Sequence, residues 1–358
     1  MKHIHRQVLE YTRSGIKTVL ATVTRSSGST PQKPGSSALF SEKGLLAGTV
    51  GGGLLEGQVQ AIANKTLVSG RSGQYVFNLE SSRGKQGILC GGEATVLIDA
   101  NPHDCLRVFE EMNRSISRRS GGILLTLFHN GDGNGKPIQR FWIEEETKSK
   151  LPASIDPAVR DAIKNHLRQG SLREFSEVPL PPVEKEREKS VFLEQIRPLP
   201  RLVIAGAGHV GKALAHIGSL LDFEITVVDD RRAFASLENI PDADHLVVRD
   251  IGQAMREIPM GKDTYVVIVT RGHRQDAEAL KPCIGSVAAY VGMIGSKHKV
   301  AAMRKQFIDE GWATPEEWAA IHTPIGMEIG SKTVQEIAIS IAAQLVSERN
   351  RINDDNEK

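Results

Sequence analysis

The sequence predicts an α/β protein in which a doubly wound parallel sheet follows a smaller N-terminal domain of mixed sheet and helix. In the second half, short apolar runs rich in β-branched residues alternate with helical patterns, which is typical of strands buried on both faces. In the first half, strand-like runs follow one another closely, as in the hairpin predicted around residues 41–44. At 358 residues the chain has room for two domains of ordinary size.

One strand–loop–helix unit, residues 201–230, is the strongest signal in the chain. A buried strand at residues 202–205 leads into three glycines in G-x-G-x-x-G spacing, then a helix and a second buried strand that ends on two aspartates. Gly206 permits the tight turn, Gly208 leaves room for a pyrophosphate, and Gly211 lets the helix pack closely. Free N–H groups at the helix N-terminus favour phosphate. The unit predicts a Rossmann-like dinucleotide-binding domain, or one of this fold that no longer binds a nucleotide.

A dinucleotide bound over this loop has a predictable set of contacts. They are Gly206, Gly208, His209, Gly211, Asp229, Asp230 and His273. The acids at the end of the second strand favour the free ribose 2′-hydroxyl of NAD, while the two arginines that follow them would tolerate the 2′-phosphate of NADP. His273 follows a later strand at its carboxyl end, where open α/β sheets place ligands. Asp276 suits either ligand contact or capping of the helix there.

Glycine-rich backbone also meets a predicted helix in the first half. Gly51, Gly52 and Gly53 directly precede a helix with apolar residues at helical spacing, a geometry suited to an anion. Tight packing of that helix on its strand is the alternative reason for these glycines. Residues 25–37 form a loop rich in serine, glycine and proline, which either offers many hydroxyl and backbone donors or is a long surface loop.

The three cysteines, Cys90, Cys105 and Cys283, make neither a disulfide framework nor a zinc site, because their spacings are unrelated. Cys90 precedes Gly91 and Gly92 at the junction of a loop and a strand, so a ligand can approach it closely. A free cysteine is otherwise most often a small buried side chain. From the residues alone, both interpretations of Cys90 stand.

Composition and charge exclude several classes of protein. A net charge of +2, with no basic stripe carrying interleaved aromatics, argues against nucleic-acid binding. The N-terminal residues lack the apolar core of a signal peptide, and no stretch is long and apolar enough to span a bilayer. We therefore expect a cytoplasmic, reduced protein that binds neither nucleic acid nor membrane.

A proline-rich and then charged segment, VPLPPVEKEREK, marks the predicted domain boundary. We predict an N-terminal domain over residues 1–180, a linker and an edge strand over 181–200, a Rossmann-like domain over 201–350 and a disordered tail over 351–358. Two modest domains joined by a flexible linker around one large ligand also predict a homodimer, in which domains can exchange between protomers.

Eight motifs, in this order, resemble those of the xanthine dehydrogenase accessory (XdhC/CoxI-type) family. They are SSGSTPQKPGSSALF, GTVGGGLLEG, ILCGGEATVLID, VIAGAGHVG, VVDDR, TRGH, YVGMIGSKHK and the closing run with IG, KT and EIA. The resemblance covers nearly the whole chain except residues 144–189. It implies a two-domain accessory protein rather than a metabolic enzyme.

Members of that family are understood to bind the molybdenum cofactor (molybdopterin), to help its sulfuration, and to deliver it to a xanthine dehydrogenase-like molybdenum hydroxylase. The resemblance implies a sulfur-donating cysteine desulfurase as a second partner and Cys90 as the ligand of the molybdenum. The expected cofactor contacts in the first half are Cys90, Gly91, Gly92, Gly51, Gly52, Gly53 and Glu56. Some relatives have His-Asp-His where this chain has Arg271-Gly272-His273, so metal binding is not expected there.

Two other functions compete with the accessory role. An NAD(P)-dependent oxidoreductase would use the Rossmann-like domain for hydride transfer, with His273 as its acid or base. A nucleotide-sensing module would use the same domain without chemistry. A cofactor carrier needs no general acid or base, and the sequence shows no convincing catalytic constellation.

Overall fold

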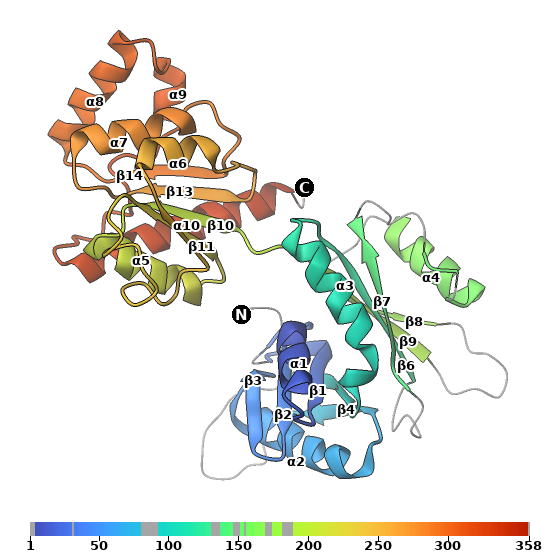
Figure 1. Cartoon of the computed structure of the whole chain (residues 1–358). Coiled ribbons are helices and arrows are strands. Elements are labelled where there is room, and N and C mark those ends of the chain that lie inside the picture. The colour runs from blue at the N-terminus through green and yellow to red at the C-terminus, as the bar shows by residue number, and fades with distance from the viewer. Residues whose placement is uncertain are drawn as a thin grey trace. The chain divides into compact units, whose positions relative to one another are not determined.

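The computed structural model describes residues 4–30, 32–79, 92–129, 137–145, 151–153, 155–168, 174–180 and 189–356. The chain forms two compact units, Met1–Pro198 and Leu199–Lys358 (Figure 1). Each unit has its own sheets and its own apolar core. None of the helices in the described ranges combines the length and apolar character that crossing a membrane requires.

The N-terminal unit contains two antiparallel sheets, ordered β3-β2-β1-β5-β4 and β7-β6-β9-β8. The strands are β1 (Val19–Gly28), β2 (Ser37–Ser41), β3 (Gly44–Gly48), β4 (Gly73–Asn78), β5 (Gly92–Asp99), β6 (Gly122–His129), β7 (Gln139–Glu144), β8 (Phe175–Pro179) and β9 (Lys189–Ile196). The helices are α1 (Ile4–Arg13), α2 (Gly53–Ser69), α3 (Leu106–Ser117) and α4 (Pro157–Arg168), with a short 3₁₀ helix η1 (Pro102–Cys105).

Strand β5 illustrates how this unit buries its residues. Successive side chains of a strand point to opposite faces of the sheet. Ala94, Val96 and Ile98 pack in one cluster with Leu55 and Val59 of α2, so the even-numbered residues of β5 face that helix.

The odd-numbered residues of β5 face the second sheet. Leu97 packs with Phe128 of β6 and Phe192 of β9. Asp99 forms an ion pair with Arg140 of β7. The space between the two sheets therefore changes from apolar to ionic along a single strand.

The Asp99–Arg140 pair is fully enclosed. Arg140 Nη1 lies 2.5 Å from Asp99 Oδ2, and each side chain is 3% exposed. The other carboxylate oxygen, Oδ1, accepts hydrogen bonds from Ser72 Oγ at 3.4 Å and from the Asn101 backbone N–H at 2.9 Å. Glu194 of β9 is buried near the same guanidinium. Burial raises the pKa of the Glu194 carboxyl to about 7, although the positive charge of Arg140 opposes the shift.

Glu194 makes the stability of the N-terminal unit depend on pH. A carboxyl group whose pKa is higher in the folded state stabilises the fold when protonated; its contribution is complete below about pH 4.5 and is lost as pH rises through about 7. We expect denaturant unfolding to show this loss in the parent, and Glu194→Gln to remove it. Parallel stability curves for the parent and Glu194→Gln between about pH 5 and pH 8 would contradict the assignment.

The C-terminal unit contains one parallel sheet, ordered β12-β11-β10-β13-β14. Its strands are β10 (Arg201–Ala205), β11 (Glu224–Asp229), β12 (His245–Val248), β13 (Thr264–Ile268) and β14 (Tyr290–Met293). Its helices are α5 (His209–Leu220), α6 (Ile251–Glu257), α7 (His273–Leu280), α8 (Lys297–Asp309), α9 (Pro315–Ala319) and α10 (Val334–Asn356), with a short 3₁₀ helix η4 (Lys281–Cys283).

Helices cover both faces of this sheet (Figure 1). Leu202 and Ile204 of β10 pack in the core formed with α5 and α10. Val203 and Ala205 pack in the core formed with α6, α7, α8 and α9. The predicted fold class, a doubly wound parallel sheet preceded by a mixed domain, is confirmed. Because β10 lies between β11 and β13, the carboxyl ends of these three strands adjoin, and ligands bind at this edge in open α/β sheets.

Two boundary predictions differ from the structure. The strand near residue 191 is not an edge strand, because β9 bonds to β6 on one side and β8 on the other; its buried run of Val191, Phe192 and Leu193 is typical of an inner strand. The tail predicted as disordered continues α10 to Asn356, and Arg349 fixes that helix by donating to the Leu221 carbonyl at 2.7 Å. The predicted linker at residues 181–188 lies outside the described residues.

Candidate functional site

The glycine loop after β10 has the geometry that its sequence predicts. Gly206 has φ +117, and a Cβ there would lie 2.5 Å from the Val269 carbonyl oxygen. A Cβ on Gly211 would lie 1.9 Å from the Gly206 oxygen, so α5 can approach the loop only without one. Nothing lies within 4 Å of the Cβ position at Gly208. The turn and packing roles are confirmed, and contact of a nucleotide at the open Gly208 stays a prediction.

Asp229, at the end of β11, uses both of its carboxylate oxygens in hydrogen bonds within the chain. Its Oδ2 accepts hydrogen bonds from the Ala207 N–H and from Arg231 Nη2, both at 2.8 Å. Its Oδ1 accepts from the Arg231 backbone N–H at 2.9 Å and from Arg231 Nε at 2.8 Å. Burial alone would raise the pKa of this carboxyl, but the hydrogen bonds from Arg231 and Ala207 outweigh it and lower the pKa to about 2. Asp229 therefore holds the glycine loop and Arg231 together.

Asp230 is the more accessible of the two acids. Its side chain is 32% exposed, and its Oδ2 accepts from Arg271 Nη2 at 2.9 Å and from Gln275 Nε2 at 3.2 Å. Of the two predicted ribose contacts, only Asp230 keeps a partly exposed carboxylate at the crevice. Arg231 turns its guanidinium over the Phe234 ring, 3.7 Å from the centroid. Positive charge thus surrounds both acids.

The loop after β13 contributes mainly to structure. His273 begins α7 on the surface, and its Nε2 lies 3.1 Å from Gln306 Oε1 of α8. Asp276 is fully buried; it accepts from Thr270 Oγ1 at 2.6 Å and from Lys299 Nζ. The N-cap of α7 is Gly272, so Asp276 does not cap the helix; it joins α7 to α8.

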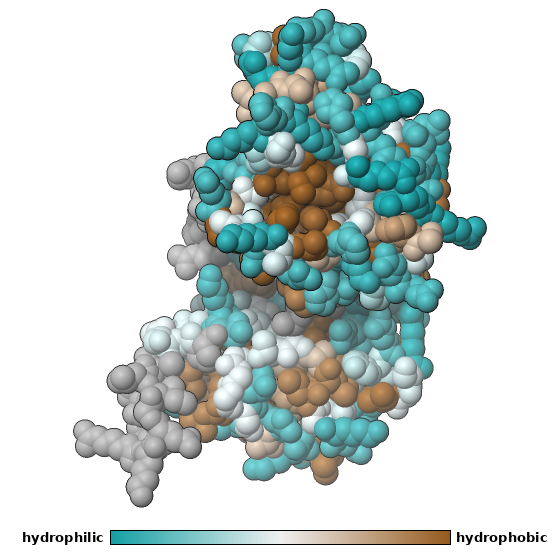
Figure 2. Space-filling view, turned by 90° about the vertical axis from the view of Figure 1, so that its left-hand side faces the viewer, coloured by the Kyte–Doolittle hydropathy of each residue, from teal (hydrophilic) through white to brown (hydrophobic). Residues whose placement is uncertain are grey.

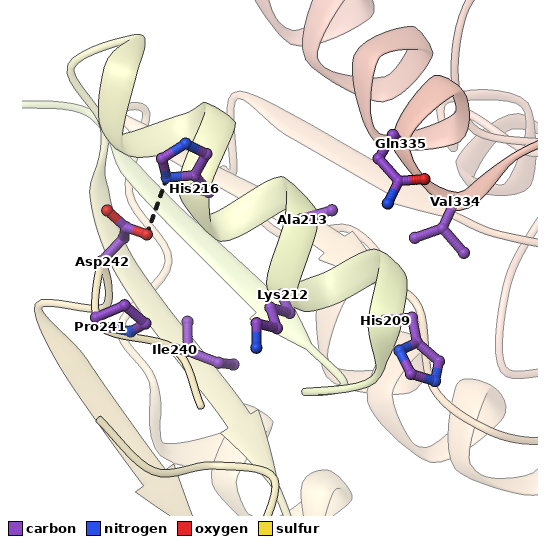
Figure 3. Close-up of a pocket in the computed structure, with 9 residues that line it drawn as sticks. All are labelled: His209, Lys212, Ala213, His216, Ile240, Pro241, Asp242, Val334 and Gln335. Carbon is purple, nitrogen blue, oxygen red and sulfur yellow. Dashed lines mark hydrogen bonds and ion pairs between the residues drawn. The ribbon is translucent and has the colours of Figure 1, made fainter. Parts of the chain in front are cut away.

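A groove of about 560 Å³ runs along the outer side of α5 (Figure 3). Its lining consists of His209, Lys212, Ala213 and His216 from α5, Ile240, Pro241 and Asp242 from the segment before β12, and Val334 and Gln335 from α10. His216 Nδ1 lies 3.0 Å from Asp242 Oδ2. The four α5 residues are spaced three and four apart in sequence, so they lie on one face of the helix.

This groove has a mixed lining, because Ile240, Pro241 and Val334 are apolar whereas Lys212, His216 and Asp242 are polar. Figure 2 shows apolar side chains gathered among hydrophilic ones in the upper part of the view, which is the C-terminal unit. Exposed large apolar side chains of this unit include Leu220, Leu237 and Ile329. His209, predicted as a nucleotide contact, lines the groove as well as following the glycine loop.

The glycine-rich loop before α2 is closed by Glu56, a residue of that helix. Gly51, Gly52 and Gly53 all have positive φ, which a side chain rarely permits. Glu56 Oε2 accepts from Thr49 Oγ1 at 2.7 Å and from the Val50 N–H at 3.3 Å. Glu56 thus closes the loop at the start of α2, and its carboxylate already supplies negative charge to that helix N-terminus.

The N-terminal unit has a pocket of about 500 Å³ between its two sheets, here named the intersheet pocket. Its lining residues are Thr24, Arg25, Ser26, Ser27 and Pro34 from β1 and the following loop, Glu93 and Thr95 from β5, His166 from α4, and Phe175, Ser176 and Glu177 from β8. The segment 25–37, predicted as a loop, does contribute to this lining, but its first residues are not a loop, because β1 continues to Gly28 in its pairing with β5. Gly51, Gly52 and Gly53, which the structure describes, do not line the intersheet pocket.

Gly92 stands at the start of β5, next to this pocket's lining. A Cβ there would lie 2.6 Å from the Ser27 oxygen and 2.8 Å from the Ser29 oxygen, so glycine lets the end of β1 pass close to β5. Cys90 and Gly91 lie outside the described residues.

The two described cysteines are buried free thiols. Cys105 Sγ lies 3.8 Å from Arg140 Nη1. Burial raises the pKa of the Cys283 thiol to about 12, which keeps it protonated. Within the ranges that the structure describes, no three His, Cys, Asp or Glu residues are grouped so as to hold a metal ion.

Comparison with known proteins identifies the family. Residues 202–345 match the family described as XdhC Rossmann domain, and residues 12–78 match the XdhC and CoxI family. A protein from Bacillus subtilis (strain 168), described as a probable xanthine dehydrogenase subunit, is 25% identical over 347 residues, which are 93% of this chain and 94% of that protein.

Two further relatives extend this result. The uncharacterized protein YqeB of Escherichia coli (strain K12) is 37% identical over 162 residues; the match spans 45% of this chain but only 29% of that protein's length. The crystal structure of a xanthine dehydrogenase from Bacillus halodurans has a TM-score of 0.73 at 22% identity and covers 97% of this chain and 96% of that one, so the two share a fold. The two family matches together span more than half of the 358 residues, and the chain belongs to the XdhC and CoxI family.

Proposed function

We propose that this chain is an accessory protein in the maturation of a xanthine dehydrogenase-like molybdenum hydroxylase. The observation that carries the proposal is the match to the XdhC and CoxI family in both halves of the chain. The relative from Bacillus subtilis, whose description is that of a probable xanthine dehydrogenase subunit, aligns over nearly the full length of both proteins. The recipient is therefore expected to be a xanthine dehydrogenase-like enzyme.

The accessory role includes binding of the molybdenum cofactor in the N-terminal unit. That cofactor is an anionic pterin with a phosphate and a thiophilic metal, and a soft thiolate suits such a metal. Cys90 is the proposed thiolate, and in sequence it stands two residues before β5, which lines the intersheet pocket. The pocket offers hydroxyl groups, a carboxylate and an aromatic wall, which fit the polar and flat parts of a pterin.

Sulfuration and delivery of the cofactor complete the proposed role. A cysteine desulfurase would supply the sulfur, and the carrier would act as a homodimer. The carrier itself performs no bond-breaking step under this proposal, so it needs no general acid or base. The dimer and the desulfurase stay predictions.

A nucleotide in the C-terminal unit is a second proposal. The open space over Gly208 and the N-terminus of α5 favour a phosphate there. A ribose over the end of β11 would have to use Asp230, because Asp229 already accepts four hydrogen bonds. Such a nucleotide fits a sensing role better than hydride transfer, because His273 pairs with Gln306 instead of standing free as an acid or base.

Replacing Cys90 tests the carrier function. The parent, made in a host that produces molybdenum cofactor, is expected to carry molybdenum and pterin and to support the recipient enzyme. Cys90→Ala is expected to lose most of the bound molybdenum while the protein stays folded, because only one small side chain is removed. Cys105→Ala and Cys283→Ala remove buried thiols and serve as matched controls that keep the cofactor.

The measurement is molybdenum and pterin content per chain, together with activation of the recipient hydroxylase. A Cys90→Ala protein that carries as much cofactor as the parent, and activates the hydroxylase equally, shows that the thiolate role is wrong. A parent that carries neither molybdenum nor pterin rejects the carrier function as a whole.

A further inference from the structure

We propose that the intersheet pocket recognises the 2-amino-4-oxopyrimidine edge of a flat bicyclic ring, the edge that pterins and guanine share, and that Glu93 accepts its hydrogen bonds. The inference rests on the proposed function, since it specifies which part of the cofactor this pocket would read. It concerns described residues of the N-terminal unit alone and does not involve the metal.

Glu93 is the free acceptor of the pocket. It lies on the same face of β5 as Thr95, Leu97 and Asp99, and it pairs with Ser27 of β1 in the sheet register. Its side chain is exposed and makes no hydrogen bond or ion pair in the part of the chain that the structure describes. A carboxylate can accept two parallel N–H groups at once. The ring N3–H and the exocyclic 2-amino group of the proposed ligand present such a pair.

Glu177, the other carboxylate of the lining, is already engaged. Its two oxygens accept from Gln74 Nε2 at 3.3 and 3.2 Å, and Arg25 Nε lies 3.1 Å from Oε2. Its side chain is only 5% exposed. The carboxylate of Glu177 is therefore occupied by contacts with Gln74 and Arg25. Of the two carboxylates that line the pocket, Glu93 is the one available to a ligand.

A donor for the 4-oxo group, the acceptor on the same edge of the ring, lies on β1. Ser27, the partner of Glu93 in the sheet register, has a hydroxyl that makes no hydrogen bond to other described residues. Arg25 uses Nε for Glu177 and keeps a side chain that is 58% exposed, so its terminal nitrogens can donate to the 4-oxo group.

A buried ring nitrogen adds a second unmet group. His166 Nε2 is buried and has no hydrogen-bond partner among the residues that the structure describes. Buried polar atoms are almost always satisfied, by protein, water or a ligand. A ligand with several ring nitrogens and an oxo group would supply such a partner.

Phe175 gives the pocket a rigid aromatic wall. Its ring stacks on Phe192, with centroids 6.3 Å apart and planes at 11°. Gly35, at φ +90, passes so close that a Cβ would lie 2.0 Å from Phe175 Cε1. A fixed ring favours stacking of a planar heterocycle. The pocket volume of about 500 Å³ lies within the range of ordinary small-molecule sites.

Titration of the full chain with defined probes tests this inference. The probes are 6-hydroxymethylpterin, lumazine (the pteridine with oxo in place of the 2-amino group) and guanosine monophosphate. Pterin is expected to bind about ten-fold or more tightly than lumazine, because lumazine lacks one of the two donors for Glu93. Glu93→Gln is expected to lose about ten-fold or more of the pterin affinity and most of this discrimination.

Glu42→Gln is the matched control, since Glu42 is exposed in the turn between β2 and β3 of the same unit and does not line the pocket. It is expected to bind every probe as the parent does. Tighter binding of pterin than of guanosine monophosphate assigns the site to pterins, and the reverse order assigns it to guanine nucleotides; both support the proposed edge recognition.

Three results would overturn the inference: no binding of pterin or guanine, equal affinity for pterin and lumazine, or unchanged pterin binding in Glu93→Gln. The outcome is separable from that of the carrier function. A parent that carries molybdenum cofactor while Glu93→Gln binds pterin normally disproves only the role of Glu93. Pterin binding through Glu93 in a chain that never acquires molybdenum disproves only the carrier function.

Discussion

Arg140→Met is expected to lower the free energy of unfolding of the N-terminal unit by about 3–5 kcal/mol, the usual cost of removing one partner of a buried ion pair. The guanidinium is enclosed, with a side chain that is 3% exposed, and it lies 2.5 Å from Asp99. Its loss leaves Asp99 with the Ser72 hydroxyl and the Asn101 N–H as its hydrogen-bond partners among the described residues. It also removes the positive charge that opposes the raised pKa of Glu194.

Two controls separate charge from packing. Arg13→Met removes an exposed arginine of the same unit, whose 2.9 Å pair with Glu110 is expected to contribute nothing measurable. The double variant Arg140→Met/Asp99→Asn removes both charges and is expected to recover part of the loss. Hydrogen exchange of the β5 and β7 amides, measured with denaturant unfolding, reports on this unit alone. Equal stabilities of Arg140→Met and Arg13→Met would show that the pair does not stabilise the unit.

The sequence was most informative where a requirement is local. Gly206 and Gly211 could be predicted because each answers a constraint within a few residues, the positive φ of Gly206 and the close approach of Gly211 to the Gly206 oxygen. Strands β10, β11 and β13 of the C-terminal unit could be predicted because both of their faces are buried and their runs are largely apolar. The match to the family confirms the resemblance that the motifs indicated.

Features that join distant parts of the chain could not be predicted. The Asp99–Arg140 pair and the intersheet pocket exist only because the two sheets of the N-terminal unit pack together, and no local pattern specifies that packing. Glu93 could not be predicted as a binding residue, because a single carboxylate in a strand indicates no function until its neighbours in space are known. The hydrogen bonds that occupy both oxygens of Asp229 could not be predicted, because the motif specifies an acidic residue but not the orientation of its carboxylate.

Gly211→Ala is expected to destabilise the C-terminal unit by about 2 kcal/mol or more. A Cβ at this position would lie 1.9 Å from the Gly206 carbonyl oxygen, which belongs to backbone that other contacts hold in place. Overpacking of this kind costs about 1–3 kcal/mol and more where backbone must shift. Alanine gains about 1 kcal/mol of helix propensity over glycine, which does not offset a clash of that size.

Gly208→Ser is the matched control for Gly211→Ala, since it changes a glycine of the same motif. Nothing lies within 4 Å of its Cβ position, and serine suits its φ of −73 and its place as the N-cap of α5. The free energy of unfolding is therefore expected to stay within about 0.5 kcal/mol of the parent. Hydrogen exchange of the α5 amides, measured beside denaturant unfolding, compares the two variants in the same unit. If Gly211→Ala is as stable as Gly208→Ser, then α5 can move away from the loop, and close packing is not what requires glycine at position 211.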